Sequence, residues 1–117
     1  MTLRENQEAF LRDFSKLIAW CFESGFTVTE GEGYRPPELA KLYASQGRGI
    51  QNSLHCDRLA HDINLFKDGN LVEGGSDEYA KVGSYWKSLS PENRFGGDFQ
   101  KLKDYNHFSR SIGDGRA

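Results

Sequence analysis

The residue types that could do chemistry in this chain are concentrated in two short segments. The first reads NSLHCDRLAHDINLF and contains His55, His61 and Asp62. The second reads KDYNHFS and places Asp104 three residues before His107, the last of the three histidines. Two imidazole nitrogens and one carboxylate, with a fourth position open to water, are the ligand set of a catalytic zinc site. Such a site also needs a base that is not a ligand, which takes a proton from the attacking water.

Spacing alone leaves the choice of ligands open. It does not choose between His55 and His61, and a single histidine is more often a surface or core residue than a ligand. Asp62 lies in a run that otherwise reads as a buried strand, where an unpartnered carboxylate costs several kcal/mol. A nearby cation would remove that cost. Three further aspartates remain alternatives to Asp62: Asp57, Asp98 and Asp104.

The elements that must position these residues begin with a long amphipathic helix. Thr2 and Glu5 form a capping box, and apolar residues then recur at helical spacing. We therefore expect a helix over about residues 3–24, ended by Gly25. Residues 26–29, FTVT, are a short strand candidate.

Two further helices are expected downstream. Pro36 and Pro37 suit the start of a second helix, which stops near Gly47. Ser76 caps a third helix with acidic residues in its first turn, and Pro91 lies just beyond its end.

A hairpin is expected between the second and third helices. The second half of HCDRLAHDINLF alternates like a strand, which places His61 and Asp62 on opposite faces. Asp68-Gly69 is a tight turn signal, and LVEGG forms the return strand. Helices and antiparallel hairpins in one core predict an α+β fold with about three helices and a small antiparallel sheet.

Length and composition limit the class of protein. With 117 residues the chain suits one domain over residues 1–117, and we expect the tail at 112–117 to be flexible. A net charge of −2 without a basic block argues against nucleic-acid binding, and no apolar run is long enough to cross a bilayer. The charged N-terminal segment does not resemble a signal peptide, so we expect a cytoplasmic protein. Cys21 and Cys56 are expected to be free thiols.

Four motifs in order resemble those of the M15 family of zinc peptidases. SLHCDRLAHD resembles the family pattern S-x-H-x-x-x-x-x-x-D, and DYNHF resembles its carboxylate three residues before a final His-Phe. GYRPPELAKLY and NRFGGDF resemble its upstream G-Y-R segment and its W-G-G-x-F element. The family includes D-alanyl-D-alanine carboxypeptidases, vancomycin-resistance D,D-dipeptidases and phage L-alanyl-D-glutamate endolysins. The compact layout is most similar to the short phage endolysins, and the implied fold is the one shared with hedgehog signalling domains.

The resemblance implies a role for each residue at a motif position. His55, Asp62 and His107 fall on the ligand positions for one Zn²⁺ ion. Asp104 falls on the position of the catalytic carboxylate, which exchanges a proton with the attacking water and the leaving amine.

Three further residues fall on positions that hold substrate in relatives: Arg35, Arg48 and Ser53. A guanidinium group suits a carboxylate or an oxyanion. Four residues depart from the pattern, among them Glu30 and Glu32, where relatives are usually less acidic. His61 stands where relatives usually carry a small apolar residue, and we interpret it as facing away from the metal. Phe95 replaces the usual Trp before two glycines.

The implied function is a zinc-dependent hydrolase that degrades the bacterial cell wall. Its substrate would be the stem peptide of peptidoglycan, cut at the L-alanyl-D-glutamate bond. A bacteriophage endolysin of this kind would act as a monomer, stay in the host cytoplasm until a holin-type opening of the membrane, and cause cytolysis. The alternatives are a D,D-carboxypeptidase or D,D-endopeptidase, and a zinc-stabilised binding module without catalysis.

Overall fold

A computed structural model describes all 117 residues, and it contains three α-helices, two 3-10 helices and five strands. The α-helices are α1 (Leu3–Glu23), α2 (Pro37–Ser45) and α3 (Asp77–Leu89). The strands are β1 (Thr27–Glu30), β2 (Ala60–Lys67), β3 (Asn70–Leu71), β4 (Asn93–Phe95) and β5 (His107–Arg110). The 3-10 helices are η1 (Leu54–Asp57) and η2 (Gly96–Asp98). The predicted α+β architecture is confirmed.

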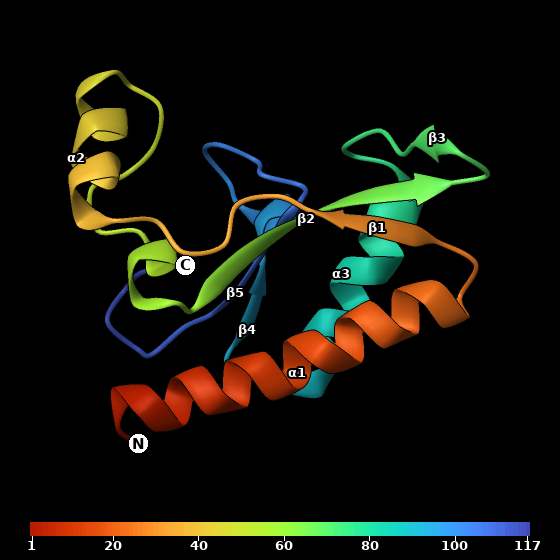
Figure 1. The fold of residues 1–117 in the computed structure, drawn as a ribbon, viewed down its shortest axis with the longest axis horizontal. Helices are drawn as coiled ribbons and strands as arrows, with labels where there is room; N and C mark the ends of the chain where they lie inside the picture. Colours follow the sequence, from red (N-terminus) through yellow and green to blue (C-terminus); the bar gives the residue numbers. More distant parts are fainter.

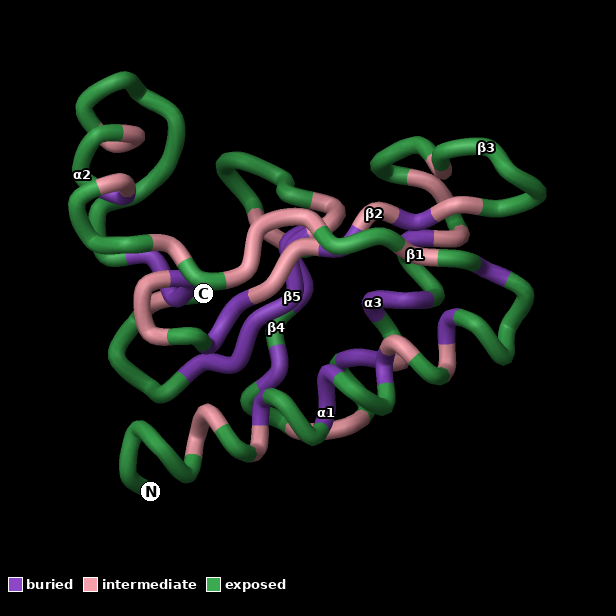
Figure 2. Tube along the Cα trace, viewed as in Figure 1, coloured by how far each residue is buried: buried purple, intermediate pink, exposed green.

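All strand pairs are antiparallel, and the sheet has the order β1-β2-β5-β4 with β3 added to β2. Helices α1 and α3 pack against each other and against the sheet, whereas α2 lies apart, beyond the long connection that follows β1 (Figure 1). The buried residues follow this division: they gather on α1, α3, β2, β4 and β5, while α2 is mostly exposed (Figure 2). No helix has the length and apolar character that a membrane span requires.

Helix α1 begins at the predicted capping box. The Thr2 hydroxyl accepts a hydrogen bond from the Glu5 backbone N–H at 3.1 Å, and the Thr2 N–H donates to the Glu5 carboxylate at 2.8 Å. The face that packs inward buries four apolar residues: Phe10, Phe14, Leu17 and Cys21. Local signals therefore set both the start and the buried face of this helix.

Trp86 of α3 is the centre of the core. Its fully buried ring meets the rings of Phe10, Phe14 and Phe108 edge-on, with centroid distances of 5.6, 6.4 and 6.2 Å. Its indole N–H donates to the carbonyl of Arg94 at 2.9 Å, so the ring buries a large apolar surface without leaving its polar atom unpaired. This packing joins α1 and α3 to β4 and β5.

The register of β2 and β5 determines what each face of the sheet presents. Asp62 lies directly opposite His107, and His61 lies directly opposite Phe108. Directly opposed residues of antiparallel strands project to the same face. Phe108 is fully buried in the core, so the face of β2 that carries His61 packs against the core. The face that carries Asp62 is on the opposite side of the sheet.

Most observed element boundaries agree within one or two residues with those predicted from the sequence, and the return strand of the hairpin differs more. The first strand begins at Thr27, and the second helix ends at Ser45. The return strand after the Asp68-Gly69 turn covers only Asn70–Leu71, shorter than the expected LVEGG. Beyond this strand, Gly74 packs against the Tyr105 ring, where an added Cβ would lie 2.7 Å from Cδ2.

Two smaller expectations concern the thiols and the tail. Cys21 and Cys56 are both free, as predicted. Residues 112–117 form no helix or strand, and Arg116 in this tail pairs with Asp57 at 2.6 Å and with Asp114 at 2.8 Å. The flexibility of the tail stays a prediction.

Candidate metal centre

Three side chains from distant parts of the sequence converge on one face of the sheet. The Asp62 Oδ1 atom lies 3.4 Å from Nε2 of His55 and 3.6 Å from Nδ1 of His107. One ligand-type atom from each of the three residues lies within 4.8 Å of the others. The structure thus brings together the three residues that the sequence motifs assign to the metal.

The strand register explains two of the three positions. Asp62 on β2 and His107 on β5 are cross-strand partners, so their side chains leave the sheet side by side. His61 projects to the opposite face, so the interpretation that it faces away from the candidate ligands is confirmed.

The third side chain, His55, is fixed by the backbone around η1. The Ser53 hydroxyl caps this 3-10 helix by accepting from the His55 N–H at 3.1 Å. The Arg35 N–H donates to the His55 carbonyl at 3.2 Å. The ring nitrogen Nδ1 lies 2.8 Å from the Gly33 carbonyl, which can only accept, so Nδ1 carries the proton. A neutral ring then has its free lone pair on Nε2, the atom that faces Asp62.

The geometry fits a tetrahedral cation. Ligand atoms about 2.0–2.1 Å from a tetrahedral zinc ion lie roughly 3.3 Å apart, close to the two distances from Asp62 Oδ1. Those distances are also too long for good hydrogen bonds. The buried Oδ1 atom of Asp62 has no hydrogen-bond partner. Because a buried carboxylate oxygen without a partner is costly, this cluster has unused capacity to bind a cation.

The pKa values of Asp62 and His55 are shifted in the directions expected for a carboxylate that lies beside imidazoles. Burial raises the pKa of Asp62, but the neighbouring His107 and His55 outweigh burial and lower it to about 2. Burial lowers the pKa of His55, but the Asp62 carboxylate and the Gly33 carbonyl outweigh burial and raise it. The carboxylate therefore stays ionised between two imidazoles, as a metal ligand must.

Asp104 lies at the edge of this cluster without belonging to the three. Its side chain is half exposed, and Oδ2 is 3.8 Å from Nδ1 of His107. A tight turn fixes it, because the His107 N–H donates to the Asp104 carbonyl and the Asp104 N–H donates to the Gly96 carbonyl, both at 3.0 Å. Gly96 has to be glycine here, since a Cβ would overlap the Asp104 carbonyl oxygen. Partial burial raises the pKa of Asp104, and His107 opposes this effect without cancelling it.

The two arginines that are predicted to bind substrate, Arg35 and Arg48, both pack against the ring of Tyr43 on α2. The guanidinium of Arg35 lies 5.3 Å from the Tyr43 ring centroid and that of Arg48 lies 4.4 Å from it. Arg35 is also ion-paired with Glu32, through Nε at 2.9 Å and through Nη2. Burial lowers the pKa of Arg35, but Glu32 outweighs burial and raises it. Arg48 is exposed and forms no ion pair.

The structure adds two contributions that the sequence motifs did not reveal. Ser53, expected near the substrate, is buried, and its hydroxyl caps η1. The Gly33 carbonyl holds the ring of His55, although the motif search singled out only its neighbour Arg35. Every residue has a backbone carbonyl, so a motif defined by side chains does not reveal which carbonyl contacts a histidine. The only signal was a glycine immediately before Tyr-Arg.

Comparison with known proteins supports the fold. The chain is similar to the crystal structure of the Serratia marcescens L-Ala D-Glu endopeptidase ChiX, with a TM-score of 0.70 and 22% sequence identity. The similarity covers 97% of this chain and 90% of that chain. No protein-family model matches the sequence, and no curated protein sequence matches it. At this level of identity, the similarity shows a shared fold over almost the entire chain.

Proposed function

We propose that this protein is a zinc-dependent peptidoglycan peptidase of the M15 type that hydrolyses the L-alanyl-D-glutamate bond of the stem peptide. The observation that carries the proposal is the convergence of His55, Asp62 and His107, with an unpartnered carboxylate oxygen between two imidazoles. The likeness in fold to an L-Ala D-Glu endopeptidase supports the choice of bond. As part of this proposal, the enzyme is a monomeric phage endolysin that stays in the host cytoplasm until the membrane is opened.

The three ligands fit the demands of a catalytic site better than those of a purely structural one. Structural zinc sites are closed by four protein ligands, whereas catalytic sites use three and leave one position for water or substrate. This cluster offers three. A zinc ion bound there would polarise the scissile carbonyl and lower the pKa of a water molecule to about 7.

Asp104 is the group proposed to move the proton. It accepts a proton from the attacking water and then donates it to the amine of the leaving D-glutamate residue. Its raised pKa suits this exchange, because the carboxyl group holds a transferred proton more readily than an ordinary aspartate. Its half-exposed position leaves room for a peptide beside it, and the turn at Gly96 keeps it 3.8 Å from His107.

Arg35 and Arg48 are proposed to bind the carboxylates of the stem peptide. D-Glutamate and the residues after it carry negative charge, which a guanidinium group recognises well. Arg48 is available for this purpose because it is exposed and makes no ion pair. Arg35 is held by Glu32, so it presents a fixed charge near His55.

The test is digestion of purified peptidoglycan with untreated, chelator-treated and zinc-restored protein, with released fragments read by mass spectrometry. We expect new N-termini at D-glutamate, lost with chelator and regained with zinc. Asp104→Asn is the matched control, because it should bind zinc without cutting. Release of free D-alanine would instead indicate a D,D-carboxypeptidase. One bound zinc with no cleavage would indicate a binding module.

A further inference from the structure

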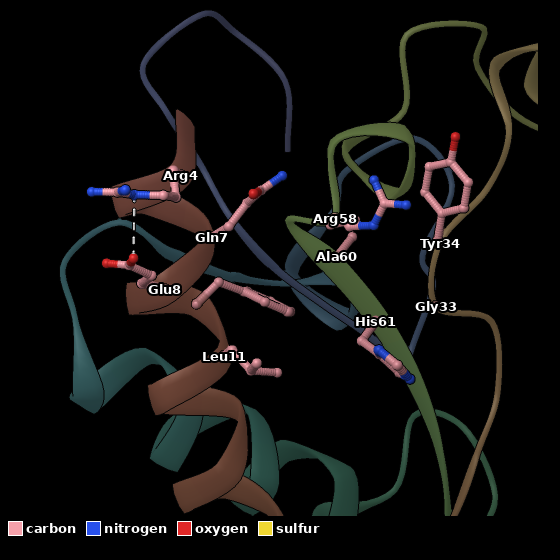
Figure 3. A pocket seen from close by; sticks show the side chains of 10 residues that line it. Arg4, Gln7, Glu8, Leu11, Gly33, Tyr34, Arg58, Ala60 and His61 are labelled. Carbon is pink, nitrogen blue, oxygen red and sulfur yellow. Dashed lines mark ion pairs between the residues drawn. The ribbon is translucent and has the colours of Figure 1, made fainter. Parts of the chain in front are cut away.

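His61 lies on the core face of β2, across the strand from the metal ligands. It forms part of a groove of about 410 Å³ between α1 and β2, which Gly33 also lines. In Figure 3 the His61 ring lies between the strand and the segment that carries Gly33. None of the roles proposed above for the metal centre uses this side chain.

The ring covers Gly33 directly. A Cβ built on Gly33 would lie 2.8 Å from Cε1 of His61 and 3.2 Å from Nδ1. Atoms this close leave no room for even a methyl group between backbone and ring. The backbone at Gly33 therefore packs on the His61 ring itself.

Two contacts fix the position of the ring. One face packs against Phe14 of α1, with ring centroids 4.7 Å apart and planes inclined by 32°. The ring nitrogen Nε2 lies 3.0 Å from the Glu30 carboxylate on β1. The ring is thus held by a buried helix residue on one side and by the neighbouring strand on another.

On its other side, the Gly33 backbone meets the metal centre. The Gly33 carbonyl lies 2.8 Å from Nδ1 of His55 and keeps the lone pair of Nε2 directed toward Asp62. A continuous row of contacts therefore runs from Phe14 through His61 and Gly33 to His55. Without the His61 ring, the segment that carries the Gly33 carbonyl would lose the side chain that packs on it at the groove.

We infer that His61 is a positioning residue for the candidate metal centre, holding the Gly33 carbonyl against His55 through the shape of its ring. The inference rests on the proposed function only in taking His55 as a zinc ligand. Partners of this kind, which orient a metal-binding histidine, typically contribute 10–100-fold to metal affinity. Because the ring touches no ligand, its loss should weaken zinc binding without changing the stoichiometry.

The primary test measures zinc affinity by competition with a chromophoric chelator. We expect His61→Ala to bind one zinc with about tenfold lower affinity than the unaltered protein. His61→Phe keeps a flat ring of similar size and should restore affinity to within about threefold. Glu30→Gln is the matched control, because it weakens the partner of the ring without removing the ring, and it should have a similarly small effect.

A double-substitution cycle separates this role from general stability. Gly33→Ala places a methyl group where the His61 ring lies, so it should weaken zinc binding by itself. In the Gly33→Ala/His61→Ala protein the methyl group occupies the vacated space. The double variant should bind zinc at least as well as Gly33→Ala, whereas independent sites would give the product of the two losses. Additive losses would overturn the inference.

A spectroscopic measurement reports on His55 itself. Nitrogen-15 NMR of the zinc-loaded protein should show the His55 proton on Nδ1, and His61→Ala should speed its exchange with water. An affinity for His61→Ala within twofold of the unaltered protein, with slow exchange retained, would overturn the inference and leave the proposed function intact. Absence of zinc binding by the unaltered protein would instead overturn the proposed function.

Discussion

The chain places two aspartates against polar side chains, Asp13 buried and Asp62 partly buried, and their carboxylates have different partners. Asp13 on α1 accepts a hydrogen bond from the side-chain amide of Asn93 at 3.1 Å. The same amide donates to the Trp86 carbonyl at 2.9 Å, so both of its protons are used. Only the neutral Asn93 Oδ1 atom lacks a partner in this cluster. The Asp13 carboxylate thus has a protein donor at hydrogen-bond distance.

Asp62 has partners of a different kind at longer distances. Its Oδ1 atom faces two imidazole nitrogens at 3.4 and 3.6 Å and accepts a hydrogen bond from neither. An amide donor brings its own proton, whereas a neutral imidazole nitrogen with a free lone pair offers a carboxylate no proton. Asp13 thus has a donor within the protein, whereas Asp62 Oδ1 has none and lies where the proposed ion would bind. The following predictions test that difference.

The largest effect should follow removal of a ligand. His55→Ala, Asp62→Ala and His107→Ala should each lose tight zinc binding and lower activity on peptidoglycan by on the order of 10³-fold or more, because the Lewis acid is lost. Zinc at 100 times its Kd should stabilise the unaltered protein by about 2.7 kcal/mol. The three variants should show no zinc-dependent change in the midpoint of urea unfolding.

The unfolding measurement also identifies a wrong ligand. A variant of the three that keeps its zinc-dependent stabilisation would remove that residue from the proposed set. If His61→Ala lost zinc to the same extent as His55→Ala, the placement of His61 on the face of β2 opposite the proposed ligands would be contradicted.

The second effect concerns Asp104, which should matter for catalysis and little for metal. Asp104→Ala should lower kcat by about 10²–10⁴-fold, the usual contribution of a proton-transfer group. Zinc content, measured by atomic absorption, should stay at one per chain, because the proposed ligand set excludes this residue. Full activity of this variant would refute the proposed mechanism.

The third effect should separate the roles of Asp13 and Asp62. Asp13→Ala removes the acceptor of a buried amide proton and should lower the free energy of unfolding by about 1–3 kcal/mol. Zinc affinity should not change, because nothing in this cluster contacts the ligands. Asp13→Asn keeps an acceptor oxygen and is the matched control, with a smaller loss expected. A change in zinc affinity on Asp13→Ala would show that the two clusters are coupled.

The parts of the molecule that the sequence predicts well are those determined by local signals. The capping box at Thr2 and Glu5 and the cap at Ser76 each lie within a few residues of the groups they bond. The alternation along β2 likewise places His61 and Asp62 on opposite faces before any partner strand is known.

The parts that spacing alone could not determine depend on contacts between distant residues. Asp62 and His107 are 45 positions apart in the sequence, and only the register of β2 with β5 places them side by side. Gly33 contacts His55, 22 positions away in the sequence, through its main-chain carbonyl oxygen. A pattern of side-chain types does not reveal such a contact. Motif resemblance assigned His55, Asp62 and His107 to one site because it carries this long-range information.

The smallest effect should come from Arg48, which lies outside both clusters. Its guanidinium packs on Tyr43 at 4.4 Å, donates to the Gln46 side chain at 3.0 Å and has no carboxylate partner. An exposed charge pair contributes about 0.2–1 kcal/mol, so Arg48→Ala should raise KM for a stem peptide by roughly 1.4- to 5-fold. The value of kcat and the zinc affinity should stay unchanged, because Arg48 touches no ligand.

The substrate provides the decisive control for Arg48. If this arginine binds a peptide carboxylate, a stem peptide with its free carboxylates amidated should have a higher KM with the unaltered enzyme. The same peptide should show no further loss with Arg48→Ala, because the two changes remove one interaction. Arg48→Lys keeps the charge without the planar fork and should have an intermediate KM. The same rise in KM on amidation with all three proteins would assign Arg48 to packing on Tyr43 and leave Arg35 as the proposed carboxylate-binding residue.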